Sequence, residues 1–127
     1  MALFDMDVGD MPEFKNPDPG EYDAIITKAE LTETKKNKDP MIVLTARINS
    51  DDPDVNGTSY KYYHVLPVKK SDFYQMQLKS TRALCENLGI DGNPEVDDFE
   101  NVECRILLEI TSNDNGEFAN IKRILAA

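Results

Sequence analysis

Several residue types on which enzymes depend are scarce in this sequence. Its 127 residues hold one histidine, two cysteines and six glycines, and the glycines form neither a phosphate-binding nor a dinucleotide-binding motif. A Ser–His–Asp triad could use only His64, and no nucleophile elbow lies near it. The two cysteines, Cys85 and Cys104, do not have the sequence spacing from His64 that zinc ligands show. We therefore expect a protein that is not an enzyme and that holds no cofactor and no metal.

Long apolar runs and a secretory leader are also missing. No apolar segment approaches the roughly 18 residues that a membrane-spanning helix needs. The first ten residues, MALFDMDVGD, are acidic and do not have the basic and apolar regions of a signal peptide. We expect an intracellular protein with no membrane partner, whose two cysteines stay reduced and buried.

Positive charge is scarce overall but is concentrated in two central segments. The 14 lysines and arginines against 24 acids give a formal net charge of −10. Residues 28–47 and 60–82 nevertheless carry a net positive charge, whereas residues 1–27 and 83–127 are strongly acidic. The net charge disfavours non-specific binding to duplex DNA, which depends on phosphate neutralisation. A local cationic surface is still compatible with it, because exposed charges are screened beyond about 8–10 Å.

Five segments have the residue pattern of β-strands. They are residues 20–34, 41–49, 58 to near 67, 102–110 and 118–125. The second alternates most clearly, because Ile42, Leu44, Ala46 and Ile48 share one face. The first is long enough to require a bend, and Asn115-Gly116 predicts a hairpin turn before the last.

One helix is expected at residues 71–89, between the third and fourth strands. Ser71 is a plausible N-cap residue, and Gly89 is suited to the position after the last turn. Apolar side chains lie at helical spacing along one stripe, which we expect to seal the core rather than to hold a cofactor. They are Phe73, Met76, Leu84 and Leu88.

The order of these elements predicts a mainly β fold. Five strands with a helix between the third and fourth are typical of the OB-fold, a five-stranded Greek-key barrel. A general α+β sandwich is the alternative. Residues 1–19 contain three prolines and no periodic pattern, so we expect a flexible acidic N-terminal arm followed by one OB-fold domain at 20–127.

The third strand, within TSYKYYHVLPVKK, combines aromatic rings with cations. If Tyr63 and Val65 face the core, then Tyr60, Tyr62 and His64 face outward, where aromatic rings can stack on bases. A register shift of one residue would exchange the two sets. In an OB-fold the second and third strands carry the nucleic-acid face. The expected phosphate contacts are Arg47, Lys35, Lys36, Lys38, Lys61, Lys69 and Lys70.

An acidic loop between the second and third strands partly matches a calcium-binding loop. Asp52, Asp54, Asn56 and Gly57 follow the spacing of its first half. The twelfth position, which needs a bidentate glutamate, is instead Tyr63. We therefore interpret this loop as a turn rich in Asp, Asn and Gly.

The chain from Pro19 to its end resembles a group of small bacteriophage proteins. They were formerly classed as a phage domain of unknown function and are regarded as OB-fold single-stranded DNA-binding proteins. The resemblance lies in PGEYDAIITKAELTETKKNKDPMIVLTARI, the tyrosine-rich third strand, ALCENLGI, VECRILLEI and GEFANIKRIL. It implies a role in phage DNA replication or recombination, in the cytoplasm of the infected bacterial host.

We expect a non-catalytic single-stranded DNA-binding protein, either a monomer or a small homo-oligomer. Acidic C-terminal tails recruit partners in many such proteins, but this sequence ends IKRILAA. Its acidic N-terminal arm, with DMPEF, can instead contact phage or host replication and recombination proteins, or cover the cationic surface. The alternatives are a protein-interaction OB module, an acidic DNA mimic that regulates replication proteins, and a metal-dependent nuclease.

Overall fold

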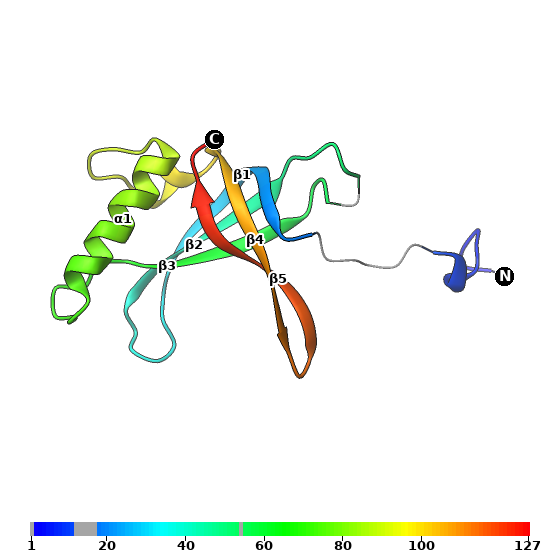
Figure 1. Ribbon diagram of the computed structural model, residues 1–127, viewed down its shortest axis with the longest axis horizontal. Helices are drawn as coiled ribbons and strands as arrows, with labels where there is room; N and C mark the ends of the chain where they lie inside the picture. Colours follow the sequence, from blue (N-terminus) through cyan, green and yellow to red (C-terminus); the bar gives the residue numbers. More distant parts are fainter. Residues whose placement is uncertain (1, 12–17, 54) are drawn as a thin grey trace.

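The computed structural model describes residues 2–11, 18–53 and 55–127 (Figure 1). It contains the five predicted strands and the predicted helix in the predicted order. The strands are β1 (Gly20–Glu33), β2 (Pro40–Ile48), β3 (Ser59–Val65), β4 (Glu103–Asn113) and β5 (Gly116–Leu125). The helix α1 (Tyr74–Leu88) lies between β3 and β4, and short 3₁₀ turns occur at η1 (Val8–Asp10) and η2 (Val96–Phe99). The mainly β class is therefore confirmed.

The strands form one antiparallel sheet in the order β3-β2-β1-β4-β5. The first part of β1 pairs with β4, with Ala24 opposite Cys104, and its second part pairs only with β2. The register with β2 shifts between Ile26 and Lys28, where β1 carries a bulge. A bulge bends a strand and increases its twist. This irregularity is the bend that the length of β1 predicts.

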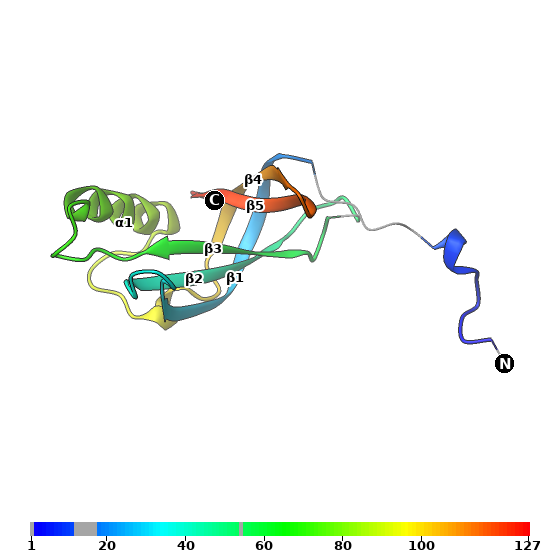
Figure 2. The ribbon, with the colours of Figure 1, turned by 90° about the horizontal axis from the view of Figure 1, so that it is seen from below.

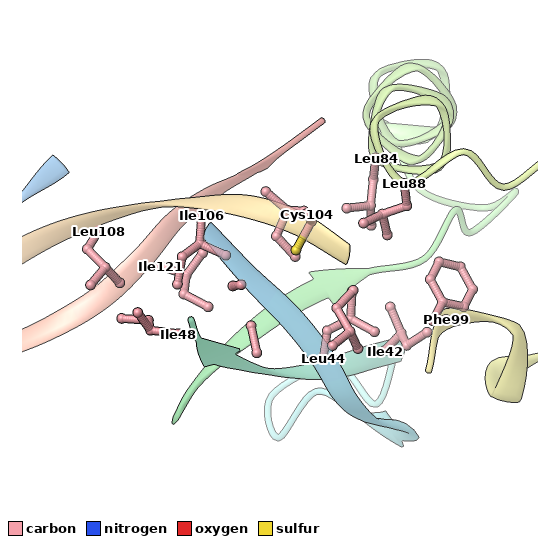
Figure 3. Close-up of a cluster of buried hydrophobic side chains, with 14 of the residues drawn as sticks. Ile42, Leu44, Ile48, Leu84, Leu88, Phe99, Cys104, Ile106, Leu108 and Ile121 are labelled. Carbon is pink, nitrogen blue, oxygen red and sulfur yellow. The ribbon is translucent and has the colours of Figure 1, made fainter. Parts of the chain in front are cut away.

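The core lies on the inner face of the sheet, where alternate apolar residues of the strands meet. Ile26, Leu44 and Ile106 are completely buried, with no exposed side-chain surface. Leu84 and Leu88 of α1 point toward this face near its end, beside Phe99 of η2 (Figure 3). The hydrophobic pattern of β2 and β4 therefore determines which side of the sheet is covered.

Only the second half of α1 packs against the sheet. Leu84 and Leu88 are buried as predicted, but Phe73 and Met76 are each 65% exposed. The prediction that all four seal the core is wrong, because α1 stands at one end of the sheet and its first turns extend beyond the strands (Figures 1 and 2). Gly89 ends the helix in the left-handed conformation, with φ of 69°, as its position predicts.

The start of α1 differs slightly from the expected one. The helix begins at Tyr74, and its N-cap residue is Phe73 rather than Ser71. The Ser71 hydroxyl nevertheless accepts a hydrogen bond from the Phe73 backbone N–H at 3.0 Å, so it satisfies a donor that precedes the helix.

Both cysteines are free, as expected. Cys104 is buried in the core and its burial raises the pKa of the thiol to about 11. Cys85 is only half-buried, so the expectation that both are buried is correct for one of them. In the described part of the chain, no helix is long and apolar enough to cross a membrane.

Candidate functional site

The pairing of β2 with β3 decides which tyrosines face outward. Ile42 is opposite His64, Leu44 is opposite Tyr62, and Ala46 is opposite Tyr60. Side chains of directly opposed residues lie on the same face of a sheet. Because Ile42, Leu44 and Ala46 belong to the core, His64, Tyr62 and Tyr60 are on the inner face.

The predicted orientation of β3 is therefore wrong. His64 is 8% exposed, whereas Tyr63 is 59% exposed. Tyr60 and Tyr62 are half-buried and pack against the core cluster. The physical reason is the register with β2, since β3 has large side chains on both faces and its own pattern does not select one.

His64 is held inside the protein by two contacts. Its Nε2 atom is 2.8 Å from the Thr81 hydroxyl of α1, with which it forms a hydrogen bond. Its ring stacks on Tyr62, with a centroid distance of 6.4 Å. Burial lowers the pKa of His64. A histidine that joins β3 to α1 in this way does not present its ring to a base.

The lowered pKa of His64 predicts a pH dependence of stability. In the unfolded chain the pKa is about 6.5, so below this pH the unfolded state binds a proton more readily than the folded state. The unfolding free energy should therefore be highest above about pH 6.5 and fall as the pH decreases toward the folded-state pKa. Urea unfolding at pH 7.5, 6.5 and 5.5 measures this, and His64→Gln is the control. An equal decrease in the His64→Gln variant would contradict the assignment.

Tyr62 lies at the edge of the core, near β5. Burial raises the pKa of its hydroxyl, and the positive charge of Arg123 partly opposes this. Burial also raises the pKa of Tyr22, whose hydroxyl donates a hydrogen bond to the Asp18 carbonyl at 2.6 Å. Tyr22 and Tyr62 are partly buried at the margin of the core, so neither belongs to an exposed aromatic surface.

The outer face of β2 and β3 carries a different set of side chains. Tyr63 is opposite Val43, Lys61 is opposite Thr45, and Arg47 is opposite Ser59. Tyr63, Lys61 and Arg47 are exposed, whereas Val43 is 9% exposed beneath them. One aromatic ring and two cations thus stand on a shared surface. We call the exposed side chains of Tyr63, Lys61, Arg47 and Lys28 the outer basic face.

Lys28 joins this surface from β1. It is opposite Thr45, and its Nζ atom is 3.0 Å from Oε1 of Glu30. The pKa of Glu30 is lowered by its hydrogen bond to Lys28 and by the charge of Lys28, and more weakly by the charge of Lys61. Glu30 therefore lies near two cations, Lys28 and Lys61, and offsets one of the three positive charges of the outer basic face.

The predicted loop lysines are exposed and lie near one end of the sheet. Lys35, Lys36 and Lys38 are in the turn between β1 and β2, and Lys69 and Lys70 follow β3. The Leu66 N–H donates a hydrogen bond to the Pro40 carbonyl at 2.8 Å, which joins the end of β3 to the start of β2. Both basic segments therefore leave the sheet at the end where Tyr63 lies.

The structure brings together Arg47 and Lys61 as predicted, and adds Tyr63 and Lys28. The sequence pattern places Tyr63 on this surface only if the register of β3 shifts by one residue, and it does not indicate Lys28. Both residues can be assigned to this surface only from the β2 residue that each one faces, and this requires the register of the strands.

Asp54 of the acidic loop lies outside the described residues, as do residues 1 and 12–17 of the arm. Residues 2–10 are exposed throughout.

The molecule is a small, mainly β protein in which strands β1 to β3 of an antiparallel sheet carry exposed cations on their outer face. The chain belongs to the family described as "Protein of unknown function (DUF669)", whose model matches residues 4–124. This match covers the whole sheet except the last residue of β5, together with α1. A search of curated proteins found no match.

Proposed function

We propose that this protein binds single-stranded DNA without catalysis, and that its sheet is a five-stranded Greek-key barrel of the OB type. The strand order supports the barrel, since the fourth strand returns to lie beside the first, which is the Greek-key order. In addition, β3 and β5, at the two ends of this order, approach each other in space (Figure 2). In OB-folds the surface of the second and third strands binds oligonucleotides.

The single observation that carries this proposal is the exposed ring of Tyr63 between basic side chains. A base stacked on an aromatic ring contributes about 1–3 kcal/mol and requires no particular sequence. Lys61 and Arg47 lie on the same face of the sheet, both toward the Ser59 end of β3 from Tyr63, where they can neutralise phosphates on that side of a stacked base. The loop lysines can extend the phosphate path past the end of β3. Little sequence preference follows, since none of these contacts reads a base edge.

The resemblance to small phage proteins supports a role in phage DNA replication or recombination within the bacterial host. We assign the regulation of DNA binding to the acidic N-terminal arm. Asp5, Asp7 and Asp10 are exposed, and their negative charges can compete with DNA phosphates for the outer basic face.

Binding of a labelled oligo-dT, measured by fluorescence anisotropy across a salt series, tests the proposal. We expect binding at about 50 mM salt, and a linear decrease of log affinity with log salt, because counterions are released from the strand. The chain lacking residues 1–19 should bind more tightly at low salt. A duplex of the same length is the control and should bind more weakly. No binding of oligo-dT at the lowest salt would contradict the proposal and would favour a protein-interaction role.

A further inference from the structure

An open apolar pocket lies on the side of the sheet away from the outer basic face. It has a volume of about 670 Å³ and is lined by α1, by the end of the sheet and by residues 90–96. Leu31 and Ile42, which are opposite each other in β1 and β2, form its floor on the inner face. Leu66 and Pro67 close it where β3 leaves the sheet. The pocket is thus separate from the surface proposed for DNA.

The lining is apolar but not covered by the chain itself. Leu31 is 59% exposed and Leu78 of α1 is 38% exposed, although both are large aliphatic side chains. Cys85 and Ile90 are half-buried in the same wall. Removing such apolar surface from water is favourable by about 25 cal/mol per Å². A volume of this size is within the range of about 300–1,000 Å³ typical of ligand sites.

The rim of the pocket is acidic. Arg82 neutralises Glu86, because the Nε atom of Arg82 is 2.7 Å from the Oε1 atom of Glu86. Within the described residues, no lysine or arginine forms a salt bridge with Asp91 or Glu95, which also line the pocket. Six acids and no lysine or arginine occur from Asp91 to Glu103. The mouth of the pocket therefore has a negative potential.

We propose that this pocket docks a segment of a partner protein that presents two or three apolar side chains flanked by lysine or arginine. The apolar wall supplies the affinity, and the acidic rim selects the charge of the flanking residues. The same rim repels nucleic acid. It also repels the arm of a second copy of this chain, since Asp5, Asp7 and Asp10 accompany the apolar residues there.

Three fluorescein-labelled ten-residue peptides can test the proposal with the full-length protein. The first combines leucines and lysines, the second has glutamate for each lysine, and the third has serine for each leucine. We expect the first peptide to bind about tenfold more tightly than each of the others, since both the apolar and the charged contacts are needed. Equal binding of the first and third peptides would show only attraction between opposite net charges and would overturn the proposal.

Pocket variants show whether the peptide binds where we propose. Leu31→Thr with Leu78→Gln should weaken the leucine–lysine peptide about tenfold, because two apolar contacts are lost. The matched control is Phe118→Thr, which removes an apolar side chain that is 45% exposed on the β4–β5 hairpin. Unchanged affinity in the double variant, with its fold verified by circular dichroism, would overturn the proposal. An equal loss in the Phe118→Thr control would overturn it as well.

A second pair of variants separates the rim charge from the overall charge. Asp91→Asn and Asp114→Asn each remove one exposed carboxylate, but only Asp91 lines the pocket. Asp91→Asn should weaken the leucine–lysine peptide by about twofold to fivefold more than Asp114→Asn does. Equal effects would show that no charge at this rim selects the partner. Failure of these tests would leave the DNA proposal intact, since they address the opposite side of the sheet.

Discussion

Replacing Tyr63 with alanine should weaken the binding of oligo-dT about tenfold, with the range for one stacked base extending from about fivefold to about 150-fold. The ring is 59% exposed on the outer face of β3, so its removal should affect the bound strand more than the fold. Fluorescence anisotropy at a fixed low salt concentration measures the change. The slope of affinity against salt should stay the same, because Tyr63 contacts no phosphate.

Tyr62→Ala is the matched control, because it removes the same side chain from the next position of β3. Tyr62 is half-buried against the core and stacks on His64. Its removal should lower the unfolding free energy more than Tyr63→Ala does, and should affect DNA binding less once the protein is folded. If Tyr62→Ala abolished binding and Tyr63→Ala left it unchanged, the outer basic face would not be the DNA surface.

Replacing Leu44 with alanine should lower the unfolding free energy by about 2–5 kcal/mol. Leu44 has no exposed surface and lies in the centre of β2, between Ala29 of β1 and Tyr62 of β3. The change removes apolar burial and leaves a cavity that the two neighbouring strands can fill only in part. Urea unfolding followed by circular dichroism measures the loss. It is large compared with the total stability of a domain, about 5–15 kcal/mol.

Leu31→Ala provides the comparison, because it is the same substitution in the adjacent strand. Leu31 is 59% exposed at the pocket, so its removal should change the unfolding free energy by less than about 1 kcal/mol. Similar losses in both variants would show that the interior is not organised around β2.

The order of the strands and the position of the helix could be predicted because local residue patterns specify them. The alternation in β2 and the turn residues Asn115 and Gly116 depend only on neighbouring positions. The hairpin between β4 and β5 and the left-handed Gly89 agree with these signals, although β5 begins at Gly116 and not at the predicted Phe118. Even the bend of β1 could be inferred from its length. Sequence reasoning works for these features because they do not require the position of a distant segment.

The proposed DNA-binding surface could not be predicted in the same way. Which side of β3 faces the core depends on its pairing with β2, and Tyr60, Tyr62 and Tyr63 offer large side chains to both sides. Likewise, Phe73 and Met76 fit a helical stripe, but the sheet ends before it reaches them. The pocket is lined by Leu31, Leu78 and Ile90, among others, and these residues are widely separated in the sequence. Its presence follows only from the way α1 meets the end of the sheet.

The division of β1 between two partners has a consequence for the newly made chain. β2 and β3 follow β1 closely, so these three strands can pair as soon as they have been synthesised. The first part of β1, however, has to wait for β4, since Ala24 pairs with Cys104. Until then, residues 20–25 form an open strand edge with unpaired backbone groups on a nascent chain. In this protein the strand that starts the sheet thus stays open to association with other chains until the fourth strand has been made.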